Sequence, residues 1–510
     1  MNQDKQNNNK KEIKCSAKME IIYRITNEDG TIEERVANID VPGKGDMDFS
    51  TIESVKRSFA AYEKATIEAG NKLREEIAND HMRDASKKKD QQEGITERLC
   101  EIESETGRVE VYLYGDAFSS LRPKERIWDC SLSERVQKLA SDVSFTKTTA
   151  YINDFLHRDE SNSLRVKTVE EFVERMGHKI RESYKAVSDA FLSEANIDTG
   201  DGVVTKESAI AVGARNPKLP ELASSERVRE IADRYNQGRD GRESIDANDI
   251  AIPLEESAND CVYVYIDGVL VKQQKECRAQ GSKRSSKFLE NTVACIQHGG
   301  RTYNITDTDM REVFRRIMTV LVACNLLVNK RLIFITDGAT DIKDHIREFF
   351  GFRQHTLILD WYHLENKCYQ KLSSALKCGK KVKEEKEQVT KTLQSILWAG
   401  NVKAALDFIA AIDQKLIKSQ KAIEELAGYI TRKQENIPCY ALRKGLGLHN
   451  SSNPVEKEND ILVAQRQKGR GMAWSREGSA ALAAITVAGQ NNERISILGG
   501  MSPNFYAYFS

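Results

Sequence analysis

The spacing of apolar and polar residues changes several times along the chain, and each change predicts a different element. Apolar residues recur at roughly helical spacing among many charges in residues 51–92, which predicts a long helix. We interpret it as a solvated surface helix, with an interaction helix as the alternative. Strict alternation in Gly107–Tyr114 (GRVEVYLY) predicts a strand, and a shorter strand-like piece spans Met19–Arg24.

Three amphipathic helices are expected between Asp129 and Ile180. They span Leu132–Val143, about Lys147–His157 with Ser144 as its cap, and a segment that begins near Thr168. Short helices with a tight junction are typical of a helix-turn-helix, although many bundles that do not bind DNA share this pattern. Residues 181–255 are polar and contain two turn-like stretches, Asp198–Gly202 and Gly238–Glu243, so we expect a linker or a variable insertion there.

Continuous apolar runs that end in aspartate dominate the next part of the chain. CVYVYIDG (Cys261–Gly268) predicts a buried strand that delivers Asp267 at its end. RLIFITDG (Arg331–Gly338) does the same for Asp337, and HTLILDWYH (His355–His363) for Asp360. Between the first two runs we expect strands at Leu270–Lys272 and Asn291–Gln297, a turn at Gly299–Gly300 and a helix over about Thr308–Val328. The order strand–strand–strand–helix–strand–helix–strand is that of an RNase H-like core.

Aspartates at the ends of neighbouring strands can face each other across a short gap. Two-metal phosphoryl transfer uses this arrangement, because hard carboxylate oxygens hold Mg²⁺ ions that activate the nucleophile and stabilise the leaving oxygen. Without metal such paired carboxylates repel each other. Asp-Gly is also a common turn, so an ordinary α/β domain remains the alternative on this pattern alone.

A charged helical stretch, residues 365–436, predicts an all-helical insertion into this core. It is followed by Ser452-Asn453-Pro454-Val455-Glu456 and then by Arg466-Gln467-Lys468-Gly469-Arg470-Gly471-Met472-Ala473-Trp474-Ser475. In residue type and spacing this stretch resembles the C-terminal signature of bacterial insertion-sequence transposases of the Kra and Lre groups, which are distantly similar to the mutator-like transposases. The resemblance covers about residues 260–490 well, residues 100–180 loosely and the first 100 residues poorly.

The resemblance implies that Glu456 completes an Asp-Asp-Glu triad with Asp267 and Asp337. It also implies that Asp360 and His363, which match the family's Asp-x-x-His motif, organise the site without being primary ligands. Ser452 or Asn453 suits an N-cap and Pro454 the first turn, so Glu456 would lie near the positive end of a helix dipole. Glu458 and Asp460 are the neighbouring carboxylates that could be mistaken for it. The polar turn before Glu456, His449–Pro454, is longer than in the family.

The expected partners are double-stranded DNA, both element ends and target, and a second copy of the chain. The expected cofactor is Mg²⁺, two ions, for which Mn²⁺ can substitute. Phosphate contacts are expected from basic residues beside the triad: Lys283, Arg284, Lys287, Arg466, Lys468 and Arg470. Recognition of the element ends is assigned to residues 130–180. The balance of 77 basic against 77 acidic residues does not itself favour a DNA-binding protein.

No apolar run reaches the roughly 20 residues of a membrane span, and Met1–Lys11 lacks a signal-peptide core, so we expect a cytoplasmic, bacterial protein, nucleoid-associated when bound to DNA, without membrane contact. The cysteines form no Cys-x-x-Cys pair, and Cys261, Cys295 and Cys324 lie in apolar runs, which predicts buried free thiols rather than zinc ligands.

The fold class is therefore α/β, an RNase H-like catalytic core interrupted by an all-helical insertion and preceded by a mostly helical N-terminal region. The expected parts are residues 1–125 (N-terminal region), 126–185 (helix-turn-helix-like, DNA-binding), 186–255 (linker or insertion), 256–364 (first part of the core), 365–440 (helical insertion) and 441–510 (last part of the core). Two alternatives remain open: a transposase-derived DNA-binding protein that no longer cuts, and an RNase H-like nuclease.

Overall fold

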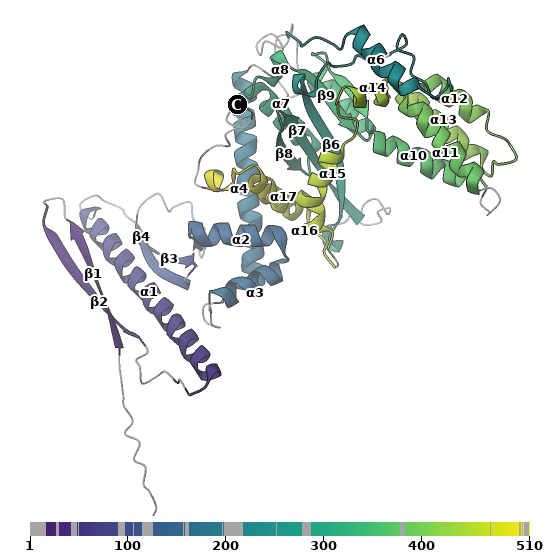
Figure 1. The fold of residues 1–510 in the computed structure, drawn as a ribbon. Coiled ribbons are helices and arrows are strands. Elements are labelled where there is room, and N and C mark those ends of the chain that lie inside the picture. The colour runs from purple at the N-terminus through teal and green to yellow at the C-terminus, as the bar shows by residue number, and fades with distance from the viewer. Residues whose placement is uncertain are drawn as a thin grey trace, which may run out of the picture. The chain divides into compact units, whose positions relative to one another are not determined.

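The computed structural model of the 510-residue chain has a mixed α/β fold (Figure 1). It describes residues 17–26, 30–41, 48, 50–89, 97–105, 107–114, 126–156, 158, 163–195, 197, 218–250, 252–277, 287–377, 383–469, 471–498, 501, 503 and 509. These residues form two compact units, Met1–Glu170 and Glu171–Ser510. The division falls inside helix α4 (Val166–Glu194) and thus within the segment 126–185 that we expected to be one part.

Among its described residues, the N-terminal unit contains two small sheets and three helices besides the start of α4. The elements are β1 (Ala17–Thr26), β2 (Ile32–Val41), α1 (Ile52–Lys89), β3 (Glu97–Ser104), β4 (Gly107–Tyr114), β5 (Ile127–Trp128), α2 (Cys130–Asp142) and α3 (Phe145–Phe155). The strands and helices predicted in this region are therefore present. The predicted cap of α3 is confirmed, because the Ser144 hydroxyl accepts a hydrogen bond of 3.3 Å from the backbone N–H of Lys147.

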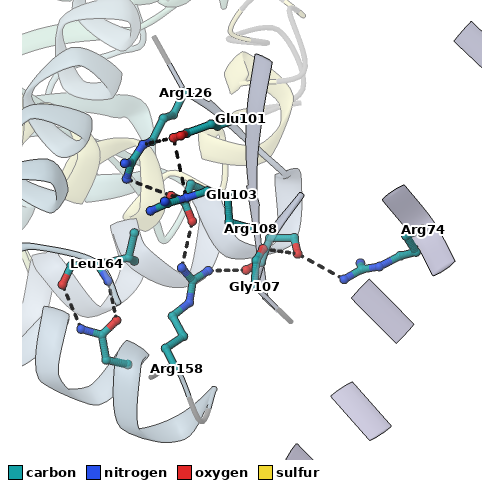
Figure 2. Close-up of polar contacts among 10 residues, drawn as sticks. Arg74, Glu101, Glu103, Gly107, Arg108, Arg126, Arg158 and Leu164 are labelled. Carbon is teal, nitrogen blue, oxygen red and sulfur yellow. Dashed lines mark hydrogen bonds and ion pairs between the residues drawn. The ribbon is translucent and has the colours of Figure 1, made fainter. Parts of the chain in front are cut away.

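A fully buried carboxylate ties this unit together (Figure 2). Glu103 of β3 accepts hydrogen bonds from Arg108 (3.0 Å), Arg126 (3.0 Å) and Arg158 (2.8 Å), and its side chain is 0% exposed. Arg158 also donates to the carbonyl oxygen of Ser104 at 2.6 Å. Burying a carboxylate is costly unless it is paired and hydrogen-bonded, and here three guanidinium groups meet that need. The cluster joins β3, β4, the start of β5 and the chain after α3.

The second unit is built around a five-stranded sheet in the order β10-β9-β6-β7-β8 (Figure 1). The strands are β6 (Cys261–Lys272), β7 (Phe288–His298), β8 (Arg301–Asp307), β9 (Arg331–Thr336) and β10 (Thr356–Leu359). β6, β7 and β8 pair antiparallel, whereas β9 and β10 run parallel to β6. Numbered along the chain, the strand order is 3-2-1-4-5, with the first strand at the centre.

Two of the predicted strands need correction. Leu270–Lys272 is not a separate strand, because β6 pairs with β7 without interruption from Tyr263 to Lys272. Asp267 therefore lies within β6 and not at its end. The strand that completes the three is β8, which was not predicted. It pairs back on β7 through the Gly299–Gly300 turn, where both glycines have positive φ, 57° and 77°. The predicted order of strands and helices holds with these boundaries.

Helices pack on this sheet and extend the unit. α7 (Met310–Ala323) and α17 (Arg476–Gln490) both contact β7 and β8, while α8 (Leu326–Asn329) and α9 (Thr340–Phe350) follow α7 and β9. The later part of α4 lies close to α17, since a Cβ on Gly177 would meet the Ala481 carbonyl oxygen at 2.2 Å. Arg181 of α4 forms two hydrogen bonds of 3.0 Å with the Asp307 carboxylate at the end of β8.

The stretch predicted as a helical insertion is helical. α10 (Trp361–Ala375) leads into it, α11 (Lys383–Trp398), α12 (Val402–Ala410) and α13 (Gln420–Lys433) lie within it, and α14 (Tyr440–Gly445) follows it. Trp398 of α11 packs edge-on against Trp361 of α10 with ring centroids 4.7 Å apart. α15 (Asn453–Asn459), one π-helical turn (Asp460–Ala464) and α16 (Gln465–Gln467) continue directly into one another.

The segment expected to be a linker is partly regular. α4 extends to Glu194, α6 covers Ser225–Asn236, and buried Glu255 pairs with buried Arg443 at 3.0 Å. The turn expected at Asp198–Gly202 lies outside the described residues. Cys261 and Cys295 are buried free thiols as predicted, whereas Cys324 is only half-buried. Among the described helices, none combines the length and the apolar character that crossing a membrane requires.

Candidate metal centre

Asp360 anchors the centre where β10 passes into α10. It occupies the N-cap of α10, and its Oδ1 accepts the backbone N–H of His363 at 2.9 Å. Its Oδ2 accepts both the backbone N–H and the hydroxyl of Ser452, which precedes α15. The Asp360 side chain is 0% exposed. A single buried carboxylate therefore joins the helix that carries His363 to the helix that carries Glu456.

Glu456 reaches the same place from the first turn of α15. Its Oε1 lies 3.9 Å from His363 Nδ1, which is itself 3.8 Å from Asp360 Oδ1. These three side chains offer ligand atoms that all lie within 4.8 Å of one another. Ser452 stands at the predicted N-cap position, but its side chain makes no cap bond because its hydroxyl donates to Asp360.

Asp267 and Asp337 come from neighbouring parallel strands. Ile266 of β6 is paired with Thr336 of β9, so each aspartate is the next residue after a paired position. Asp267 accepts hydrogen bonds from the backbone N–H of Gly268 (2.8 Å) and from the side-chain amide of Asn459 (2.6 Å).

Asp337 starts the turn that leads from β9 to α9. It accepts the backbone N–H of Ala339 at 2.7 Å, while Gly338 between them has φ of +84°. That backbone conformation suits glycine, since an L side chain there would be strained. The hydrogen bond and the glycine together set the direction of the Asp337 carboxylate.

The pKa values reflect how close these groups are. Burial, together with the neighbouring Asp337 charge, raises the pKa of Asp267. Burial, together with Asp360, raises the pKa of Glu456. The Asp360 carboxylate, with Asp267 and Asp337 further off, raises the pKa of His363. Burial alone would raise the pKa of Asp360, yet the groups of His363 and Ser452 that face it lower it.

Three carboxylates lie in or directly after α15, and of these Glu456 is the one at the candidate metal centre. Glu458 instead accepts a hydrogen bond of 2.9 Å from Asn304 of β8, and Asp460 accepts one of 2.7 Å from Gln465. Asp360 and His363, which we expected to organise the site without being primary ligands, lie within ligand distance of Glu456. Asp267 and Asp337 lie outside the 4.8 Å group but within electrostatic reach of His363.

Two residues of the centre were not predicted. Asn459 lies three residues after Glu456, on the same side of α15, and holds Asp267. Glu290 of β7 reaches across Gly268, where a Cβ would stand 1.8 Å from its Oε1. Burial, then the charges of Asp341, Asp267 and Asp337, raises the pKa of Glu290. Neither residue has a local sequence signal, because each reaches the centre through strand pairing or helix placement.

The predicted phosphate contacts divide into three groups. Lys283, Arg284 and Arg470 lie outside the described residues, while Lys287 and Lys468 are exposed. Arg466 is a correction: its side chain is buried and its guanidinium lies 5.1 Å from the Trp474 ring centroid. Burial lowers the pKa of Arg466 to about 10. A side chain held in this way packs the chain and does not present its charge to DNA.

The donor set fits a divalent cation. Carboxylate oxygens are the ligands that Mg²⁺ and Mn²⁺ share, and imidazole nitrogen adds affinity for a transition metal such as Mn²⁺. His363 Nδ1 is buried and lacks a hydrogen-bond partner among the residues that the structure describes. Comparisons of the chain with protein-family models, with curated proteins and with solved structures found no match.

Proposed function

We propose that the chain is a DNA transposase of the Asp-Asp-Glu type with an RNase H-like core, which cuts and joins DNA at the ends of an insertion sequence. One observation carries the proposal: Asp267 and Asp337 follow paired positions of two parallel strands, and Glu456 approaches from α15 beside His363. The strand order 3-2-1-4-5 is the order of the RNase H-like fold, and the sequence signature at Ser452–Glu456 and Arg466–Ser475 favours a transposase.

Asp267, Asp337 and Glu456 would hold Mg²⁺ or Mn²⁺, with Asp360 and His363 beside them. Bound there, two such ions supply activation of the attacking oxygen and neutralisation of the leaving oxygen. The chain itself fixes the geometry: Asn459 and Gly268 orient Asp267, the Gly338 turn orients Asp337, and Asp360 holds α15 against α10. Positioning of this kind is the main contribution of protein side chains to in-line phosphoryl transfer.

Recognition of the element ends is proposed for α2, α3 and the start of α4, as a helix-turn-helix. Exposed Lys147 and Tyr151 lie on α3 and could face a DNA groove. Two ends must be handled together, so we propose that the protein acts as a homo-oligomer on double-stranded DNA in the bacterial cytoplasm.

The noncatalytic alternative is disfavoured by a specific feature, the full set of carboxylates around His363. A protein that only binds DNA gains nothing from burying Asp267 next to Asp337, because this raises the free energy of the folded state. An RNase H-like nuclease would use the same centre and differs only in its products, since a nuclease stops at cut ends.

The test is an assay with DNA that carries the element's own ends, in Mg²⁺ or Mn²⁺, comparing wild type with Asp267→Asn and Asp337→Asn. We expect wild type to cut and join, and both variants to lose at least about 10³-fold of each step, as expected when a main source of charge stabilisation is removed. Cut ends that are never joined would favour a nuclease. Binding of the ends without any cutting would favour the noncatalytic protein.

A further inference from the structure

The C-terminal end of α13 brings a lysine onto the turn that carries Asp337. Lys433 is the last residue of α13, and its ammonium donates a hydrogen bond to the carbonyl oxygen of Gly338. A Cβ on Gly338 would lie 3.4 Å from Lys433 Cε and 2.8 Å from Leu359 Cδ1. The stem of Lys433 therefore covers this turn, and the helical insertion reaches the edge of the candidate metal centre through it.

Further positive charge lies beside Lys433. Lys343 of α9, Lys433 and Asn436 line one small hollow next to this turn. Burial, and then repulsion from Lys343 and Arg432, lowers the pKa of Lys433, although Asp337 attracts its charge. Within the described part of the chain, neither Lys343 nor Lys433 forms an ion pair with a carboxylate. The two cations thus lie together at the edge of the acidic centre and form no direct ion pair with it.

Grouping like charges costs free energy in the free protein, and binding of an anion removes this cost. A DNA strand carries one phosphate for roughly every 3.4 Å of helix axis. When one phosphodiester lies at Asp337, a neighbouring phosphate of the same strand passes within reach of a side chain on the adjacent turn. The position of the cations relative to Asp337 therefore matches a DNA backbone better than an isolated anion.

We propose that Lys343 and Lys433 bind the DNA phosphate next to the one that is cut, so that the helical insertion forms one wall of the DNA groove. This inference rests on the proposed function and assigns a role to the insertion within it. Contacts of this kind position the strand without reading its sequence. Lys433 also steadies the Asp337 turn, and its two roles separate in their dependence on salt.

The test measures the affinity of the full chain for a fluorescent duplex of arbitrary sequence, about 30 base pairs long, without divalent metal and over a series of KCl concentrations. We expect Lys433→Met and Lys343→Met each to reduce the slope of log K against log [KCl] by about 0.9, the loss of one phosphate contact. Lys433→Arg should keep the wild-type slope. Lys421→Met, in the first turn of the same helix and exposed, is the matched control and should also keep it.

Three results would contradict the inference in different ways. A wild-type slope in both methionine variants means that the lysines do not contact phosphate, while the proposed function stands. A reduced slope in Lys421→Met as well would show a diffuse effect of charge and no defined contact. A wild-type chain that does not bind the duplex at any salt concentration overturns this inference and the proposed function together.

Discussion

Asp267 is held by hydrogen bonds that favour its charge, in a buried position beside Asp337 that disfavours it. The Gly268 N–H and the Asn459 amide orient its carboxylate, yet burial and Asp337 raise its pKa. A carboxyl group whose pKa is higher in the folded state opposes folding once it ionises, and this penalty sets in as pH rises through the ordinary carboxyl range. At neutral pH the ionised Asp267 therefore lowers the stability of the metal-free protein.

Asp267→Asn should accordingly stabilise the protein while it removes the proposed activity. The amide oxygen still accepts the Gly268 N–H, and the amide nitrogen replaces the oxygen that faced Asn459, whose side chain must turn its own oxygen toward it. The new side chain carries no charge against Asp337. In EDTA at neutral pH we expect Tm to rise by roughly 2 °C or more. Mg²⁺ should raise Tm of wild type but not of the variant. A variant that melts below wild type in EDTA would show that the carboxylate contributes to folding and does not oppose it.

His363 should also make the stability fall as pH rises, but over a higher pH range than Asp267. Its pKa is raised above 6.5, chiefly by Asp360, so the imidazolium stabilises the fold below that value, and the effect is lost as pH rises through the folded-state pKa. In metal-free urea unfolding, His363→Gln should therefore cost more stability at about pH 6 than at about pH 8.5. Equal losses at both pH values would mean that His363 acts through packing alone.

The central aspartates could be predicted from sequence because they follow apolar runs whose ends meet at one edge of a sheet. Asn459 and Glu290 could not, since their place depends on the register of α15 and β7 against β6. Arg466 was assigned wrongly for a related reason: a basic residue in a motif looks exposed until Trp474 is seen to cover it.

Strand prediction failed where the pattern was short or interrupted. Asp-Gly at 267–268 looked like the end of a strand, yet β6 continues because β7 pairs with it on the far side of Gly268. β8, RTYNITD, alternates too weakly to stand out, and its burial comes from α7 and α17, which pack on it. The helices were easier to predict because their apolar spacing runs over several turns.

Glu103 provides a test at the level of elements in the N-terminal unit. Its carboxylate balances Arg108, Arg126 and Arg158, and Glu103→Gln would leave these guanidinium groups without their buried counter-ion (Figure 2). We expect a loss of about 3 kcal/mol of stability, as for breaking a buried ion pair. The exposed carboxylate of Glu110 on the adjacent β4 offers Glu110→Gln as a matched control.

Hydrogen exchange of the full chain would locate this effect. We expect faster exchange in β3 and α3 of Glu103→Gln, with β6 unchanged, because the two segments belong to different compact units. Unchanged exchange in β3 would mean that the arginines find other partners and that the buried carboxylate does not hold these elements together.

In the whole molecule, we propose a separate task for each of three regions. The five-stranded sheet and α15 carry the carboxylates, the helical insertion provides Lys433 beside them, and the helices after β5 are proposed to bind element ends. The apolar pattern predicted the strands and the helical stretch in outline, although the boundary between the two compact units falls within a segment expected to be one part. It did not predict that Asp360 would connect α10 with α15, since that link spans 92 residues of chain.

The most direct test of the central claim compares Glu456→Gln with Glu458→Gln in the assay for cutting and joining element ends. Both changes remove one carboxylate charge from α15 without altering size, but only Glu456 faces His363, whereas the Glu458 side chain bonds to Asn304. The account predicts that Glu456→Gln loses at least about 10³-fold in both steps and that Glu458→Gln stays within about threefold of wild type. An active Glu456→Gln beside an inactive Glu458→Gln would contradict the metal centre described above.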